Sequence, residues 1–142
     1  MKNKVEILSR KAAKLLIEGE FPKHTAVISF HDPDDKPLMH KGCDRVFCIA
    51  IHDIDIECLP EFGLAFDTYF PEAPVLAAFI KTAVADGCNI LCQCEYGQSR
   101  SAACAAAIRE YYDREGIRVY ADYRYYPNQM IFNKLLAALR GE

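Results

Sequence analysis

The sequence lacks clusters of basic residues, and its hydrophobic runs are short. Its 17 Lys and Arg residues are scattered among 20 Asp and Glu residues, with no basic run longer than Arg10-Lys11. Because nucleic-acid-binding surfaces concentrate positive charge, we expect no nucleic-acid partner. The most apolar windows, such as residues 75–84, are too short or too interrupted to cross a bilayer, and residues 1–20 carry charges throughout instead of an apolar signal core. The sequence therefore predicts a cytoplasmic protein with no membrane partner.

Internal repeats, low-complexity segments and linkers rich in Pro, Gly or Ser are also absent. The chain has 142 residues, of which 51% are hydrophobic and 26% are charged. A chain of this length buries roughly two thirds of its unfolded surface when it folds, which is enough for one hydrophobic core. We expect residues 1–142 to form a single domain.

Seven cysteines are a high count for this length, and intramolecular disulfides cannot use an odd number completely. In a reducing compartment, a cysteine is a buried apolar residue, a metal ligand or a nucleophile. The neighbours of each cysteine must therefore decide its role.

Apolar segments with strand character alternate along the chain with segments of helical spacing. Strands are predicted at residues 5–8, 25–30, 45–51 and 89–94, and helices at residues 10–18, 71–86, 101–114 and 127–140. Ser9 suits the start of the first helix, and Pro127 fits the first turn of the last helix. The first three helices are expected to end at Gly19, Gly87 and Gly116. Loops are predicted at residues 31–42 and 52–63, whereas residues 119–125 fit either a strand or a loop.

This alternation predicts an α/β fold with a mostly parallel central sheet, flanked by helices on both faces. Ligands of such sheets bind at the carboxyl ends of the strands. A polar turn stands at that position, between the fourth predicted strand and the third predicted helix.

The polar turn reads Cys94-Glu95-Tyr96-Gly97-Gln98-Ser99-Arg100-Ser101. Converging N–H groups at the start of a helix form an anion site, and their positive field also stabilises a thiolate. Gly97 suits a backbone with positive φ or a close approach of the ligand. Arg100 offers a planar fork of donors that matches two phosphate oxygens. A cysteine at the base of an anion-binding loop indicates nucleophilic attack on phosphorus.

The stretch CEYGQSRS resembles the Cys-(x)5-Arg-Ser/Thr active-site loop of the protein tyrosine phosphatase superfamily, and most of all that of the small dual-specificity phosphatases. The pattern Cys-x-x-Gly-x-x-Arg-Ser/Thr would arise by chance on the order of once in a thousand such chains. Weaker similarity spans residues 43–140: an apolar strand, an acidic loop and a helix beginning Tyr-Phe precede the loop, and Pro127-Asn128 opens the last helix. The loop is the specific part.

The resemblance implies a role for each position of the loop. It makes Cys94 the nucleophile that forms a phosphocysteine intermediate and Arg100 the group that holds the phosphoryl oxygens. Ser101 hydrogen-bonds the sulfur and helps it leave in the second step. The remaining oxygens bind the backbone N–H groups of Glu95, Tyr96, Gly97, Gln98, Ser99 and Arg100. The resemblance implies no metal and no cofactor, and the partner is a phosphorylated protein or a small phosphomonoester.

The superfamily also uses an aspartate on a mobile upstream loop, which protonates the leaving oxygen and later activates water. The candidates are Asp53, Asp55 and Asp67. Asp53 is favoured because it follows directly on the strand at residues 45–51, as the family acid does. The chain departs from the family at Gln93, where a histidine usually precedes the nucleophile. A neutral amide orients backbone groups but carries no charge.

The favoured function is hydrolysis of phosphotyrosine, or of mixed protein phosphoesters, through a phosphocysteine intermediate. A phosphate-binding pseudophosphatase, which binds phosphopeptides without turning them over, is the first alternative, because Gln93 replaces the usual histidine and three aspartates compete for one role. The second is a sulfurtransferase or arsenate reductase, in which the same thiolate attacks sulfur or arsenic. Arg100 followed by Ser101 suits phosphate better than either.

The other cysteines are expected to pack in the core. Cys48 and Cys92 are alternative partners for a reversible disulfide with Cys94, which would protect it from over-oxidation. Cys88 and Cys92 lie on one strand without a full set of further ligands, so packing is favoured over a metal site.

Several polar and aromatic residues have two interpretations. The acidic run at residues 32–35 is expected to be a solvated turn rather than a cation site. Most of the four histidines are expected on the surface or in loops, and the alternative for His52, beside Asp53, is to tune the acid loop. The tyrosines of residues 120–126 either pack against the protein or line the substrate pocket. Asn128 is a helix cap or, by the resemblance, a residue near the pocket.

Overall fold

The computed structural model describes the whole chain and contains one sheet of four parallel strands. The strands are β1 (Val5–Ser9), β2 (Thr25–His31), β3 (Val46–Ala50) and β4 (Asn89–Cys94), in the spatial order β1-β4-β2-β3. Val27 on the inner strand β2 lies opposite Leu91 of β4 and Val46 of β3. Six of the seven residues of β2 are buried, because helices cover both faces of a parallel sheet.

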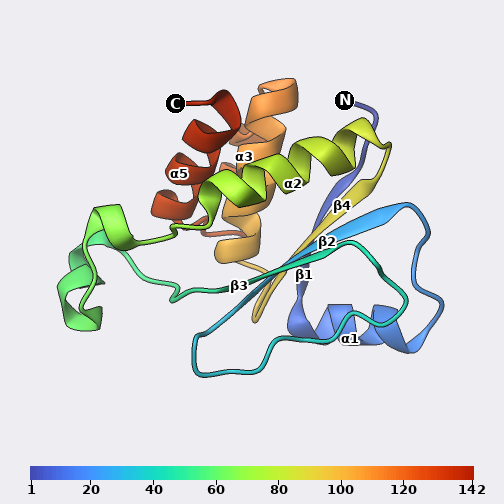
Figure 1. Cartoon of the computed structure of the whole chain (residues 1–142), viewed down its shortest axis with the longest axis horizontal. Helices are drawn as coiled ribbons and strands as arrows, with labels where there is room; N and C mark the ends of the chain where they lie inside the picture. Colours follow the sequence, from blue (N-terminus) through green and yellow to red (C-terminus); the bar gives the residue numbers. More distant parts are fainter.

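Five helices surround this sheet: α1 (Arg10–Glu18), α2 (Ala73–Ala85), α3 (Arg100–Asp113), α4 (Ile117–Tyr120) and α5 (Gln129–Arg140). Figure 1 shows α1 on one face and α2, α3 and α5 together on the other. Helix α3 is buried along residues 100–108, where small alanine side chains let it pack closely between the sheet and α5. The predicted α/β class, with a parallel sheet flanked by helices, is confirmed.

The helix ends follow the sequence in part. The backbone N–H of Ala12 donates to Ser9 Oγ at 3.0 Å and caps α1, and Gly87 has a φ of +81° just beyond α2. Helix α3, however, ends at Asp113 and is capped by Arg114, which has a φ of +58°, and not by Gly116. Gly116 is needed for another reason, because a Cβ there would lie 2.9 Å from the carbonyl oxygen of Ala106.

Three segments differ from the sequence prediction. Residues 52–63 include a 3-10 helix, η1 (Ile56–Phe62), and a second one, η2 (Phe66–Thr68), follows. Residues 119–125 are neither strand nor plain loop, because α4 continues to Tyr120 before a turn begins. Pro127 lies just outside α5, since Asn128 occupies the N-cap. In each case, local hydrogen bonds that a periodicity pattern does not reveal decide the boundary.

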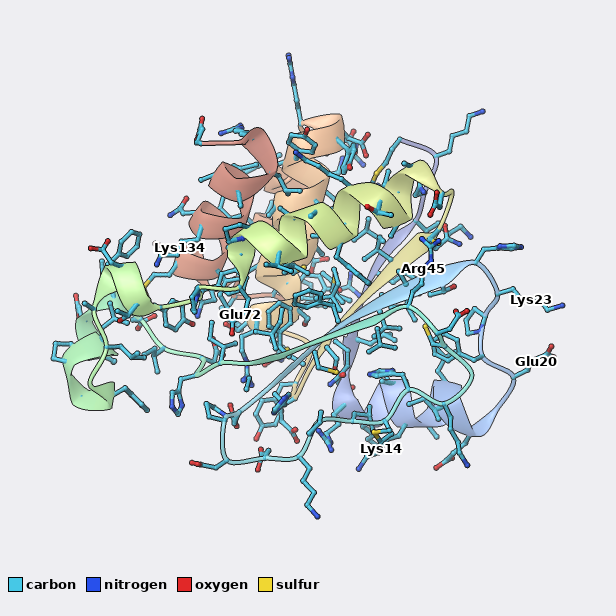
Figure 2. All side chains as sticks on the ribbon, viewed as in Figure 1. Lys14, Glu20, Lys23, Arg45, Glu72 and Lys134 are labelled. Atoms are coloured by element: carbon cyan, nitrogen blue, oxygen red, sulfur yellow. The ribbon has the colours of Figure 1, made fainter.

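Most charged side chains lie on the outside of the layers, with Arg100 as a buried exception. Figure 2 shows Lys14, Glu20 and Lys23 on the outer side of α1 and of the loop that follows it. Most of the buried apolar residues form one core cluster of 27 side chains. No helix is both long enough and apolar enough to span a membrane.

Candidate active site

The polar turn lies at the carboxyl edge of the sheet, where β4 ends at Cys94 and α3 begins at Arg100. Its carbonyl groups are held by the protein: Glu95 O accepts from Arg10 N at 3.0 Å, Gln98 O from Tyr126 N at 2.7 Å, and Ser99 O from Asn128 N at 3.2 Å. None of the N–H groups of residues 95–100 donates a hydrogen bond to another protein group. The loop therefore keeps its donors available at a helix N-terminus, which is the arrangement of an anion site.

Gly97 lies where the loop meets the first strand. Its φ is +67°, a conformation that side chains disfavour. A Cβ at this position would lie 2.7 Å from the backbone nitrogen of Ser9 and 2.9 Å from the carbonyl carbon of Leu8. A glycine is thus required here, as predicted, because of the positive φ and because the backbone packs closely against the end of β1.

The thiol of Cys94 is buried, with 3% of the residue exposed. Its Sγ lies 3.0 Å from Ser101 Oγ, in the first turn of α3. When the sulfur is ionised, the hydroxyl donates to it, and the positive end of the 14-residue helix stabilises the same charge. Cys104 lies further along α3, where burial and the neighbouring Cys92 raise its pKa. Cys104 is thus a packing thiol, as expected, and Cys88 and Cys92 are also buried; the expectation is wrong for Cys48, which is exposed on β3.

Arg100 is held by one edge of its guanidinium group. Its Nη1 donates to Asp32 Oδ1 at 2.7 Å and to the carbonyl oxygen of Ile51 at 2.8 Å. The residue is only 4% exposed, and its Nε is buried without a hydrogen-bond partner. The edge formed by Nε and Nη2 is thereby left for a ligand with two oxygens, such as a phosphoryl group.

Asp53 is tied directly to the loop. Its Oδ1 accepts from Ser99 Oγ at 2.7 Å and from Asn128 Nδ2 at 3.0 Å. The side chains of Asp55 and Asp67 make no hydrogen bond to the loop, and both residues are exposed. Of the three candidate aspartates, Asp53 is the one placed beside the anion site.

Asn128 connects Asp53 to the body of the protein. Its Oδ1 accepts from Ile131 N at 3.0 Å and caps α5, while its Nδ2 also donates to Tyr69 Oη at 3.2 Å. The Tyr69 hydroxyl in turn donates to the carbonyl oxygen of His52 at 2.6 Å. Burial raises the pKa of Tyr69, which keeps the hydroxyl protonated as a donor. Asn128 is therefore a helix cap that also holds Asp53 beside the loop.

No family model and no curated protein matches this sequence, but solved structures match it. Human DUSP28 is 16% identical with a TM-score of 0.59, over 96% of this chain and 92% of that one. A mouse putative dual specificity phosphatase, complexed with zinc tungstate, is 20% identical with a TM-score of 0.58, over 94% and 80%. OH1 of Orf virus, a tyrosine phosphatase with triple substrate specificity, is 14% identical with a TM-score of 0.59, over 96% and 82%.

The chain has the fold of the small dual-specificity phosphatases. Within this dual-specificity phosphatase fold, Cys94, Arg100 and Ser101 meet at the loop, and Asp53 joins them from the segment after β3. Tyr120 packs edge-to-face on Phe132, and the backbone N–H of the exposed Tyr126 donates to Gln98 O of the loop. Packing is therefore confirmed for Tyr120, while a substrate-lining role of this segment stays a prediction.

Two residues at this site have contacts that their sequence context does not reveal. Asp32 was expected in a solvated turn, yet it forms an ion pair with Arg100. His40 was expected on the surface or in a loop, and it is a loop residue that is only 7% exposed and contacts Gln93. The one sequence signal that could have placed Asp32 at the site is that it follows β2 directly, which brings it to the carboxyl edge of the sheet.

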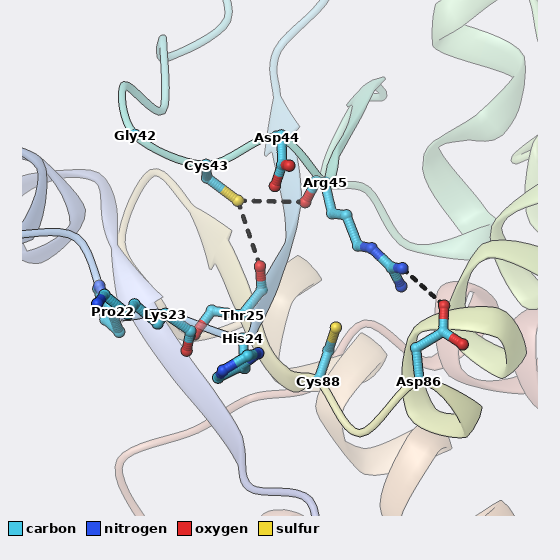
Figure 3. Close-up of a pocket in the computed structure, with 10 residues that line it drawn as sticks. All are labelled: Pro22, Lys23, His24, Thr25, Gly42, Cys43, Asp44, Arg45, Asp86 and Cys88. Atoms are coloured by element: carbon cyan, nitrogen blue, oxygen red, sulfur yellow. Dashed lines mark hydrogen bonds and ion pairs between the residues drawn. The ribbon is translucent and has the colours of Figure 1, made fainter.

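A cavity of about 420 Å³ lies at the opposite, amino-terminal edge of the sheet. Figure 3 shows Cys43, Arg45, Asp86 and Cys88 around it. The thiol of Cys43 donates to the carbonyl oxygens of Thr25 and Arg45, both at 3.4 Å, and burial raises its pKa. No group of three or more His, Cys, Asp or Glu side chains in the chain is arranged to hold a metal ion.

Proposed function

We propose that residues 1–142 form a phosphatase domain that hydrolyses phosphomonoesters, either phosphotyrosine or mixed protein phosphoesters, with Cys94 as the nucleophile. The observation that supports this most is the loop itself. The N–H groups of residues 95–100 have no partner in the protein, and the Cys94 thiol lies at their base. Such a loop stabilises the charge of a phosphoryl group more strongly as it develops in the transition state.

In the first step, the Cys94 thiolate attacks phosphorus and the bond between phosphorus and the ester oxygen breaks. The Nε and Nη2 edge of Arg100 holds two phosphoryl oxygens. Asp53 gives its proton to the departing oxygen, so the alcohol leaves neutral. Because Asp53 Oδ1 already accepts two hydrogen bonds, Oδ2 is the oxygen that carries the proton.

In the second step, water attacks the phosphocysteine, the sulfur–phosphorus bond breaks, and inorganic phosphate is released. The Asp53 carboxylate takes the proton of the attacking water. Ser101 donates a hydrogen bond to the departing sulfur from a distance of 3.0 Å. The enzyme thus returns to its starting protonation state.

The proposed substrate is a phosphorylated protein rather than a polyanionic head group. The loop presents Glu95, Tyr96 and Gln98 at positions where added basic residues would bind further phosphates. The net charge of −3 disfavours polyanions as well.

The test is hydrolysis of para-nitrophenyl phosphate, followed by phosphotyrosine and phosphoserine peptides. Wild-type protein should release phosphate in the presence of a metal chelator. Cys94→Ser should abolish turnover, whereas the matched control Cys48→Ser, at an exposed cysteine, should retain it. Activity that survives in Cys94→Ser would overturn the mechanism. Binding of a phosphopeptide without any turnover by the wild type would support the pseudophosphatase instead.

A further inference from the structure

Gln93, the residue before the nucleophile, is locked in place by three hydrogen bonds. It is 1% exposed, and its Oε1 accepts from Ser29 Oγ at 2.5 Å. The same oxygen lies 3.2 Å from His40 Nε2. Its Nε2 donates to the carbonyl oxygen of Cys94 at 3.1 Å. The side chain therefore joins β2 and the loop after it to the first peptide of the anion-binding loop.

The peptide unit between Cys94 and Glu95 sets the direction of the first N–H group of the loop. The carbonyl of Cys94 and the N–H of Glu95 belong to one planar, trans peptide unit and point in opposite directions. A hydrogen bond that fixes the carbonyl consequently fixes the direction of the first N–H of the anion-binding loop. Gln93 holds this N–H without touching it.

His40 lies in the long loop between β2 and β3 and is 7% exposed. Because an amide oxygen only accepts hydrogen bonds, His40 Nε2 must carry the ring proton and donate it to Gln93 Oε1. His40 Nδ1 is buried and has no hydrogen-bond partner. Burial and the positive charge of Arg10 lower the pKa of His40, while the hydrogen bond to Gln93 opposes them. The ring is thereby kept neutral, in a single tautomer.

We propose that His40 is a positioning residue for the nucleophile, acting through Gln93. The imidazole and the Ser29 hydroxyl occupy the amide oxygen of Gln93, which leaves the amide nitrogen only one direction, toward the Cys94 carbonyl. The loop N–H groups are then aligned before any anion or thiolate is present. The inference rests on the proposed function only in that Cys94 is taken as the nucleophile.

The reactivity of Cys94 toward iodoacetamide at pH 7 tests this inference without requiring turnover. Mass spectrometry of the separated peptides gives a rate for each cysteine, and exposed Cys48 is the internal control. His40→Asn is too short to reach Gln93 and should slow alkylation of Cys94 about three- to tenfold, the worth of one hydrogen bond. His40→Gln places an amide N–H near the position of Nε2 and should restore the rate.

A matched control lies at the other end of the sheet. His24 has a φ of +53°, which asparagine tolerates, so His24→Asn should leave the Cys94 rate unchanged. In a Gln93→Ala background, His40→Asn should have no further effect, because the connecting side chain is gone. An equal slowing in both backgrounds, or the same rate for His40→Asn and His40→Gln, would overturn the inference.

The failure of one proposal is distinguishable from the failure of the other. Protein that alkylates Cys94 in a His40-dependent way but hydrolyses no phosphomonoester would overturn the proposed function and support the role of His40. Active protein whose Cys94 alkylation rate does not depend on His40 would support the proposed function and overturn the role of His40.

The NMR chemical shifts of the imidazole nitrogens of wild-type protein give a measurement that is independent of any variant. A proton on His40 Nδ1 instead of Nε2 would contradict the proposed contact.

Discussion

The two ends of the parallel sheet carry the same three kinds of side chain in different surroundings. A cysteine, an arginine and an aspartate occur at each end: Cys94, Arg100 and Asp32 at the carboxyl edge, and Cys43, Arg45 and Asp86 at the amino edge. The Arg100 side chain is 5% exposed in its ion pair, whereas that of Arg45 is 39% exposed. Residue type alone thus does not distinguish the candidate active site from an ordinary surface.

The backbone around each thiol makes the difference. Cys94 lies below a row of N–H groups at the start of α3, and it faces the hydroxyl of Ser101. Cys43 instead faces two carbonyl oxygens, and Asp86 follows the last residue of α2, the negative end of that helix. Donors stabilise a thiolate and bind anions, while acceptors repel both. Strand direction in a parallel sheet therefore decides which end presents free backbone N–H groups beside its cysteine.

Replacing the arginine at each end by lysine should give the largest contrast in kcat/KM between the two ends. Arg100→Lys loses the fork that holds two phosphoryl oxygens and should lower kcat/KM about a hundred- to thousandfold. Arg45→Lys alters only a partly exposed ion pair and should stay within about twofold of wild type. Steady-state kinetics with para-nitrophenyl phosphate measures both, and similar losses in the two variants would contradict the comparison.

Removing the candidate acids should separate Asp53 from its neighbours. Asp53→Ala should lower kcat near neutral pH about a hundredfold or more, because the leaving oxygen loses its proton donor. Asp55→Ala is the matched control, because Asp55 lies two residues away and makes no hydrogen bond to the loop, and it should leave kcat nearly unchanged. With phenyl phosphate as the substrate, the loss of kcat in Asp53→Ala should be larger, because phenolate is a poorer leaving group than para-nitrophenolate. An unchanged kcat in Asp53→Ala would remove that residue from the role.

The aspartate of each ion pair can be tested in the same way. Asp32→Ala should raise KM about tenfold, because Arg100 loses a charged partner that orients its free edge. Asp32→Asn, which keeps an acceptor, should have a smaller effect. Asp86→Ala should leave KM unchanged. A KM in Asp32→Ala equal to that of wild type would show that Ile51 and burial suffice to hold Arg100.

The smallest expected effect is on the pH dependence of stability, in variants of His40 and of His24. The pKa of His40 is lowered from the usual 6.5 by burial and by Arg10. The unfolded chain therefore takes up a proton near pH 6.5, while the folded protein does so only at lower pH. The resulting contribution to stability is present above pH 6.5 and is lost as the pH falls toward the folded-state pKa. Thermal unfolding between pH 7.5 and pH 5 should show a steeper loss for wild type and His24→Asn than for His40→Gln. Equal slopes for His24→Asn and His40→Gln would contradict this.

The elements that could be predicted are those whose residues are contiguous. Strand β4 and the loop after it follow from an apolar segment, a glycine and the start of a helix, all within residues 89–101. The start of α1 at Ser9 is equally local. The end of α3 was predicted to within one residue, but its capping residue was wrong. Arg114 adopts the left-handed conformation expected of a glycine, and the N–H groups of Arg114 and Glu115 donate to carbonyl oxygens of the last helical turns.

The contacts that were missed join distant parts of the chain. Asp32 and Arg100 are 68 residues apart, His40 and Gln93 are 53 apart, and Asp53 and Asn128 are 75 apart. The composition of residues 32–35 indicates a solvated turn, and nothing local shows that its first carboxylate meets a buried guanidinium. The long loop before β3 likewise gives no indication that His40 turns inward.

The sequence by itself determined the α/β class and the place of a cysteine-containing loop between a strand and a helix, because propensity, capping and turn chemistry act over a few neighbouring residues. Tertiary structure placed Asp53, the aspartate that the sequence favoured, against that loop, and it alone decided what holds Arg100 and that His40 and Ser29 contact Gln93. Those pairings depend on the strand order β1-β4-β2-β3, which brings the carboxyl ends of β2, β3 and β4 to one edge. Strand order is set by packing of the whole core, which no short stretch of sequence contains.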